Sequence, residues 1–366
     1  MAGSRGVTIG VCAVASALLL AGCGSRPAES GGGSTGGSSA PSGTAFNACM
    51  VLDTGGVDDK SFNQSSWAGM QAAAQANPNI KISYVPSNTA NDYTPNLTAE
   101  ANKKCDTTVA VGGLMTDNVK EVAAKNPSLK FAQVDAASSG PNVYGMQFNT
   151  AQGAFLGGYL AAGMSQSGKV ATWGGLNIPP VSIYMDGFYE GVQYYNQQKG
   201  KNVQVLGWNE ADQKGGTFAG SFTDQNKGLQ ISQTFIQQGA DVIFPVAGGA
   251  GLGAGAAAQA AGGKVNLIWV DTDGCVSASQ FCQYFISSVT KNLSGAVQTY
   301  VTAAAGGTFP TGNYIGDLKN DGTGLAPFNQ FDSKVPADLK SELEKVKADI
   351  ISGAITVKSP SQPKST

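Results

Sequence analysis

The feature that most constrains the fold is a regular alternation of two kinds of segment from residue 46 onward. Short apolar runs indicate strands at 48–52, 81–85, 108–111, 129–134 and 142–148. Between them, helical apolar spacing indicates helices at 61–76, 91–104 and 117–124, with Ser61 and Asp117 as expected N-caps. Strands that are joined through helices run parallel, so this half of the chain is expected to form a doubly wound α/β unit.

A second series of the same kind follows. Strands are expected at 169–173, 203–207, 242–246 and 265–270, and helices at 151–164, 181–195, 224–238 and 251–261. Two further strands at 284–289 and 313–318, with helices near 293–305 and 336–351, remain to be distributed between the two units. In open α/β sheets ligands bind beyond the carboxyl ends of strands, so two facing lobes would hold a ligand between them.

Glycine and polar residues gather where these strands end. The segments are 53–64, 112–117, 245–249, 271–274 and 287–292. No GxGxxG follows the first strand and no GxxxxGK[ST] occurs, so dinucleotide and P-loop sites are disfavoured. Carboxylates accept hydroxyl and ring N–H groups, and aromatic faces stack on planar groups, so a neutral, hydrogen-bonding ligand fits this set.

The composition removes several function classes. The 366 residues contain no histidine, which excludes Ser-His-Asp and Cys-His catalysis and histidine-ligated zinc. The net charge is -2, so nucleic acid is a poor partner. No cofactor and no metal are expected.

The N-terminus resembles a bacterial lipoprotein signal. An apolar run at 7–20 is too short to span a membrane and ends in Leu20-Ala21-Gly22-Cys23, which is similar to a lipobox. We therefore expect residues 1–22 to be a signal peptide, Cys23 to carry the lipid, and Gly/Ser-rich residues 23–44 to form a tether. An ordinary secretory signal with a chance cysteine is the alternative.

Four cysteines remain after such processing, and an oxidising compartment allows them to pair. Three pairings are possible. Cys49–Cys105 would join two predicted strand starts in one lobe, and Cys275–Cys282 would close a short loop. We favour this pairing over free buried thiols.

Several long motifs, in order, resemble the basic membrane protein family of lipoproteins. They include DDKSFNQ at 58–64, NVYGMQFNTAQGAFLGGYLAA at 142–162, GKVATWGG at 168–175, VDTDG at 270–274 and SVTKN at 288–292. The resemblance spans about residues 48–351. The sequence departs from the family pattern at Gln152, where an acidic residue is usual, and at an insertion that holds Cys275 and Cys282.

The resemblance implies a type I periplasmic-binding fold, with two lobes, three hinge crossings and a nucleoside between them for delivery to an ABC importer. Phe62 and Phe222 match the stacking positions, Asp53 and Asp117 those that bond the base, and Asp271 or Asp273 with Lys291 those that hold the ribose. The supporting contacts implied are Ser61, Asn63, Gly248 and Gly249.

We thus expect lobe 1 to comprise 45–148 and about 288–315, lobe 2 to comprise 149–287 and about 316–356, and 357–366 to be a tail. The expected protein is a monomer on the extracytoplasmic face of the cell membrane, with permease subunits as partners and adenosine, guanosine or inosine as ligand. The alternatives are the same fold with a sugar, or a surface antigen; an enzyme such as a nucleoside hydrolase is disfavoured.

Overall fold

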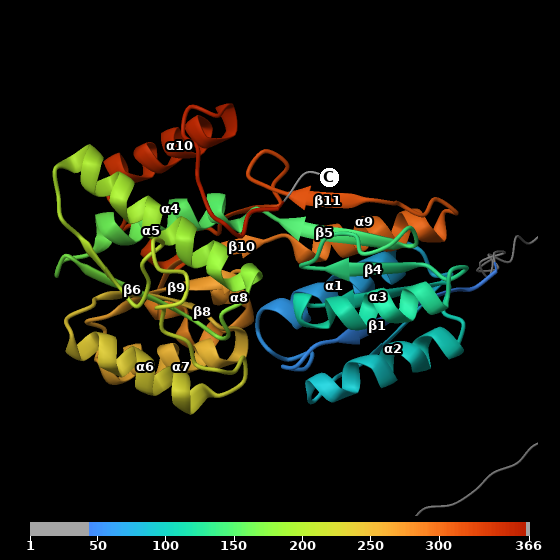
Figure 1. The fold of residues 1–366 in the computed structure, drawn as a ribbon. Helices are drawn as coiled ribbons and strands as arrows, with labels where there is room; N and C mark the ends of the chain where they lie inside the picture. The colour runs from blue at the N-terminus through green and yellow to red at the C-terminus, as the bar shows by residue number, and fades with distance from the viewer. Residues whose placement is uncertain (1–43, 364–366) are drawn as a thin grey trace, which may run out of the picture. The chain divides into compact units, whose positions relative to one another are not determined.

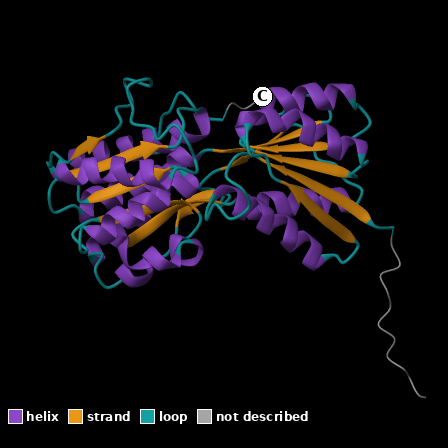
Figure 2. Cartoon of the chain, turned by 90° about the horizontal axis from the view of Figure 1, so that it is seen from below, coloured by secondary structure: helices purple, strands orange, loops and turns teal. Residues whose placement is uncertain are grey.

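The computed structural model describes residues 44–363 and contains two six-stranded sheets (Figure 1). The strand orders are β11-β5-β4-β3-β1-β2 in the first sheet and β12-β10-β9-β8-β6-β7 in the second. Every pairing is parallel except that of β12 with β10. Helices lie on both faces of the sheets, as Figure 2 shows, so the expected α/β architecture is confirmed.

The first lobe contains most of the N-terminal half. Its elements are β1 (Phe46–Leu52), α1 (Phe62–Ala76), β2 (Ile80–Val85), α2 (Tyr93–Asn102), β3 (Thr107–Val111), α3 (Thr116–Lys125), β4 (Phe131–Val134), β5 (Val143–Phe148), α9 (Leu293–Ala305) and β11 (Asn313–Gly316). The last two elements return after the second lobe has been built. The predicted strands and helices correspond closely to these elements.

The second lobe contains the remaining long helices. Its elements are α4 (Thr150–Met164), β6 (Lys169–Gly174), α5 (Pro179–Lys199), β7 (Gln204–Leu206), α6 (Gln225–Gln237), β8 (Val242–Val246), α7 (Leu252–Ala260), β9 (Asn266–Asp271), α8 (Gly274–Ser277), β10 (Phe285–Lys291), β12 (Thr323–Leu325) and α10 (Ala337–Ser352). Short 3₁₀ turns link several of them.

Three crossings connect the lobes, after β5, after β10 and after β11. This agrees with the three-crossing hinge that the resemblance implied. One boundary differs from expectation: β10 pairs with β9 as far as Thr290 and with β12 as far as Lys291, so the return to the first lobe begins near Asn292 and not near residue 288.

Helices α4 and α5 pack unusually closely in the second lobe. A Cβ on Gly158 would lie 2.0 Å from the Phe188 carbonyl oxygen, and one on Gly191 would lie 2.0 Å from that of Phe155. Only glycine permits such an approach of two helix backbones. Helix α4 is buried along most of its length, and the face of α5 that carries Tyr184 is buried with it.

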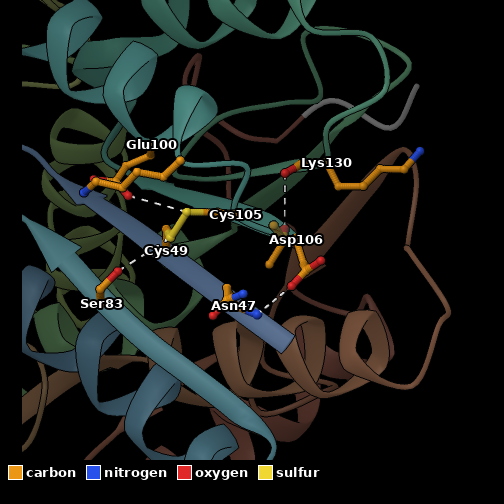
Figure 3. The surroundings of a disulfide bond; sticks show 9 residues. Asn47, Cys49, Ser83, Glu100, Cys105, Asp106 and Lys130 are labelled. Atoms are coloured by element: carbon orange, nitrogen blue, oxygen red, sulfur yellow. Dashed lines mark hydrogen bonds and ion pairs between the residues drawn. A yellow bond between two sulfur atoms is a disulfide. The ribbon is translucent and has the colours of Figure 1, made fainter. Parts of the chain in front are cut away.

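Both expected disulfides are present. Cys49–Cys105 joins the middle of β1 to the loop just before β3 (Figure 3). Cys275–Cys282 closes the inserted loop before β10. Within residues 44–363, the only cysteine and carboxylate group close enough together to hold a metal is Cys49, Glu100 and Cys105, and the disulfide occupies both sulfurs.

The segment at 357–363, expected to be a tail, packs along α5. The backbone N–H of Lys358 donates to Glu190 at 2.7 Å, and the Ser359 hydroxyl donates to the buried Asp186 carboxylate at 2.5 Å. Among the helices of the described chain, none is both long enough and apolar enough to cross a membrane. The predicted signal peptide, Cys23 and all but the last residue of the tether lie outside the described residues.

Candidate functional site

A cavity lies between the carboxyl ends of the strands of the two sheets. It has about 590 Å³ of space free of atoms, part of which is open to solvent. Residues from both lobes line it: Asp53, Thr54, Gly55, Asp59, Phe62, Asn63, Gly112, Gly113, Asp135, Ile178, Pro180, Val181, Tyr184, Phe222, Val246, Ala247, Gly248, Val270, Asp271 and Lys291. This is the position that the strand-end rule predicts.

The loop between β1 and α1 forms the first-lobe wall. Ser61 precedes α1, but its side chain does not cap the helix, contrary to the prediction. The Asp59 carboxylate does so, because it accepts the backbone N–H groups of Ser61, Asn63 and Gln64 at 3.0, 2.8 and 3.1 Å. This cap orients the first turn of α1, from which Phe62 and Asn63 reach the cavity.

Asp53 and Asn63 form a buried pair on this wall. The Asn63 amide nitrogen donates to the Asp53 carboxylate at 2.9 Å, which leaves the Asn63 carbonyl oxygen buried without a partner. Burial raises the pKa of Asp53 well above its usual range, and the hydrogen bond from Asn63 opposes that rise. Burial also raises the pKa of Asp59 to about 6, against the effect of its three backbone hydrogen bonds.

Asp271 forms the second-lobe side of the site, at the end of β9. Its carboxylate accepts the Tyr184 hydroxyl at 2.7 Å and the Ser61 hydroxyl at 2.6 Å. Ser61 belongs to the first lobe, so this second bond crosses between the lobes. Asp271 has φ +65°, an uncommon value for a residue with a side chain, and such strain persists only where the surroundings hold it.

Lys291 lies at the end of β10, where the chain crosses back to the first lobe. Its ammonium group is 2.6 Å from the Asp135 carboxylate and 3.9 Å from that of Asp271. It also lies 4.9 Å from the centre of the Phe62 ring. Burial raises the pKa of Asp135, and the nearby Lys291 charge opposes the rise. Burial, followed by the Asp271 charge, raises the pKa of Tyr184 well above its usual range.

The structure brings most of the predicted site residues together. Those that line the cavity are Asp53, Phe62, Asn63, Phe222, Gly248, Asp271 and Lys291. Ser61 lies beside it through its bond to Asp271, and a Cβ on Gly249 would lie 3.3 Å from the Phe222 carbonyl oxygen.

Besides Ser61 and Gly249, which lie next to lining residues, two predicted residues do not line the cavity, Asp117 and Asp273. Asp117 lies in the first turn of α3, which begins at Thr116 with Met115 as its N-cap, so Asp117 is not the expected cap either. Gly112 and Gly113 line the cavity, and the 3₁₀ turn at Gly113–Met115 then leads the chain from there into α3. Asp273 instead caps α8, accepting the backbone N–H of Cys275 at 2.9 Å. Of the two aspartates that the sequence left open, Asp271 is therefore the one at the cavity.

Sequence reasoning did not select Asp135 and Tyr184. Asp135 directly follows β4, as Asp53 follows β1, and that position was its only signal. Tyr184 lies inside a helix, where its spacing indicated only a buried face. Both side chains touch the Asp271–Lys291 group and line the cavity.

Two α/β lobes with three crossings and a cavity between them are the architecture of the periplasmic-binding-protein fold. Residues 46–360 match the family model described as "ABC transporter substrate-binding protein PnrA-like". The chain belongs to this family, the Bmp family, whose members serve ABC transporters as substrate-binding proteins and are not enzymes.

Individual relatives agree with this assignment. The chain is 31% identical to a "CD4+ T-cell-stimulating antigen" of Listeria innocua, over 96% of each protein. It is 29% identical to the "ABC transporter nucleoside-binding protein BmpA" of Lactococcus lactis, over 97% of this chain and 99% of the relative.

A solved structure also resembles the whole described fold. An ABC transporter solute-binding protein from Aeropyrum pernix superposes with a TM-score of 0.78 at 26% identity, over 86% of this chain and 94% of that chain.

Proposed function

We propose that the protein binds a nucleoside in this cavity and delivers it to the permease subunits of an ABC importer. The observation that carries the proposal is the placement of Phe62 and Phe222 on opposite lobes of one cavity whose polar wall is rich in acceptors. Aromatic faces stack on a planar base, and closure of the lobes would bring both faces to it. A nucleoside is also what the name of the Lactococcus relative states that it binds.

The Asp53–Asn63 pair supports recognition of a base edge. The free Asn63 carbonyl oxygen and the Asp53 carboxylate are acceptors held side by side by their mutual hydrogen bond. Buried acceptors without partners are costly, so a ligand that supplies N–H donors satisfies them. Purine bases with ring or exocyclic N–H groups, as in guanosine, inosine and adenosine, provide such donors.

The charge of the cavity supports a ligand without phosphate. Asp53, Asp59, Asp135 and Asp271 line it, and Lys291 is the one basic residue in its lining. Phosphate recognition relies on clustered Arg or Lys, whereas carboxylates accept ribose hydroxyls. Asp271 and Lys291 suit this second role, so a nucleoside is favoured over a nucleotide.

We further propose that the mature protein is a monomer attached by a lipid on Cys23 to the extracytoplasmic face of the cell membrane. The support is the Leu-Ala-Gly-Cys sequence at 20–23 and the Gly/Ser-rich segment after it. Metabolic labelling with a radioactive fatty acid tests the lipid attachment directly. Label in the wild type and none in Cys23→Ala is the expected result, and label in both would contradict it.

Isothermal titration with adenosine, guanosine, inosine, uridine and free ribose tests the ligand class. At least one nucleoside is expected to bind at one site per chain. Asp53→Asn should weaken that binding, whereas Asp117→Asn, which alters a similar carboxyl outside the cavity, should leave it unchanged. Heat from ribose or another sugar and from no nucleoside would refute the proposal.

A further inference from the structure

A second group of contacts between the lobes lies just outside the ligand cavity, on the backbone carbonyl of Lys60. The Trp269 indole N–H donates to this oxygen at 3.2 Å, and the Thr272 hydroxyl donates to it at 3.3 Å. Lys60 is in the first lobe, and the two donors are in the second. None of the three residues lines the cavity.

The first-lobe side of this contact is held in a fixed direction. Lys60 has φ +60°, an uncommon conformation for a residue with a side chain. The residues on either side hold it there, because the Asp59 carboxylate is bonded to three backbone N–H groups of α1 and the Ser61 hydroxyl is bonded to Asp271. The carbonyl is thus presented to the second lobe without freedom to turn away.

The second-lobe side is held by the inserted loop. The Thr272 hydroxyl has a single proton, which it gives to Lys60, so the Ser277 hydroxyl 2.8 Å away donates to Thr272. Ser277 belongs to α8, which Asp273 caps and the Cys275–Cys282 disulfide closes. The Asn329 amide donates to Asp273 at 3.1 Å and fixes that cap in turn.

We infer that Thr272, supported by Ser277, is a positioning residue that holds the lobes closed through the Lys60 carbonyl without touching the ligand. Lys60 lies between the cavity residues Asp59 and Phe62, and Thr272 follows the cavity residue Asp271. The same contact therefore fixes one wall of the cavity in each lobe. The inference rests on the proposed binding between the lobes, but not on the identity of the ligand.

The consequence for binding follows from the two-state equilibrium between open and closed lobes. Apparent affinity is the intrinsic affinity of the closed form multiplied by the fraction of protein that is closed. Loss of one such hydrogen bond should lower the ratio of closed to open ligand-free protein roughly two- to tenfold, which reduces the apparent affinity and raises the mean radius of gyration. The loss should be the same for every ligand, since the contact meets none of them.

The test compares Thr272→Val with Thr272→Ser in the full-length protein. Valine keeps the shape but removes the hydroxyl, whereas serine keeps the hydroxyl. Titration with each nucleoside that the wild type binds should show an equal two- to tenfold loss of affinity for Thr272→Val, with faster dissociation. Thr272→Ser should remain within about twofold of the wild type, and Ser277→Ala should fall between the two.

Three results would overturn the inference: wild-type affinity in Thr272→Val, an equal loss in Thr272→Ser, or losses that differ between ligands. Small-angle X-ray scattering of the ligand-free variants separates this inference from the proposed function. If no nucleoside binds the wild type, the nucleoside proposal fails, and the scattering of the ligand-free variants then tests the Thr272 contact by itself. A larger radius of gyration for Thr272→Val than for Thr272→Ser supports the contact, and equal radii refute it.

Discussion

Lys291 is the residue whose loss should reveal most about how this cavity is stabilised. Its side chain is 3% exposed, and its ammonium group compensates Asp135 at 2.6 Å and lies 3.9 Å from Asp271. Lys291→Met keeps the length and the apolar stem but removes the charge. It leaves two buried carboxylates facing each other without a cation between them.

The magnitude follows from the burial of this pair. Removing one partner of a buried ion pair costs about 3–5 kcal/mol, because the other charge stays desolvated. We therefore expect the free energy of unfolding of Lys291→Met to fall by about that amount. The matched control is Lys340→Met, which breaks an exposed pair of 2.7 Å with Asp332 and should cost less than about 1 kcal/mol.

The pH dependence has a defined sign. Burial already raises the pKa of Asp135, and Lys291 opposes that rise, so removing Lys291 raises the pKa further. A carboxyl group whose pKa is higher in the folded than in the unfolded protein favours folding at low pH and loses this contribution as pH rises. The deficit of Lys291→Met should therefore be smaller at pH 5 than at pH 8.

Urea denaturation of the wild type, both single variants and Lys291→Met/Asp135→Asn at the two pH values measures these quantities. The double variant should recover a large part of the loss, since no unpaired Asp135 charge remains. A loss of less than about 1 kcal/mol in Lys291→Met, or a deficit that does not change with pH, would refute this account of the cavity.

Three further predictions concern ligand binding and stability. Phe62→Ala should weaken nucleoside binding by about 1–3 kcal/mol in titration calorimetry if the ring stacks on the base, and an unchanged affinity would contradict the stacking. Because burial raises the pKa of Asp53, affinity for guanosine should be constant at high pH and fall by up to about tenfold per pH unit below that pKa. Asp53→Asn should bind guanosine more weakly but without this pH dependence. A wild-type affinity that rises on acidification would contradict the acceptor role of Asp53. In thermal unfolding, replacing Cys49 and Cys105 by Ser should destabilise the protein by about 4 kcal/mol, and replacing Cys275 and Cys282 by Ser should destabilise it by about 2.5 kcal/mol. The first disulfide should contribute more because it closes a loop of 56 residues, whereas the second closes a loop of 7. The reverse order would count against the loop-entropy account.

The sequence predicted the elements well because strand and helix signals are local. Apolar runs such as 108–111 and the helical spacing of 181–195 depend only on neighbouring residues. The assignment of β10 to the second lobe depends instead on pairing with β9 and β12, which come from distant parts of the chain. The boundary expected near residue 288 therefore fell inside β10, a few residues too early.

The same distinction applies to the site. Asp53 and Asp271 were predicted because each directly follows a predicted strand and matches a position that the family resemblance implies. Asp117 also follows a Gly-Gly turn, but the 3₁₀ turn after Gly112 carries it into α3 and away from the cavity. Asp135 follows a four-residue strand without any motif, and only its ion pair with Lys291 reveals its role.

The three crossings also determine the order in which the protein can be completed during synthesis. The core of the first lobe includes Leu293, Val297, Tyr300 and Val301 of α9, and its sheet ends in β11. A ribosome must therefore produce the whole of β6–β10 before the first lobe can cover its apolar face. The nascent N-terminal half therefore exposes this apolar face through the interval, as chaperone substrates do.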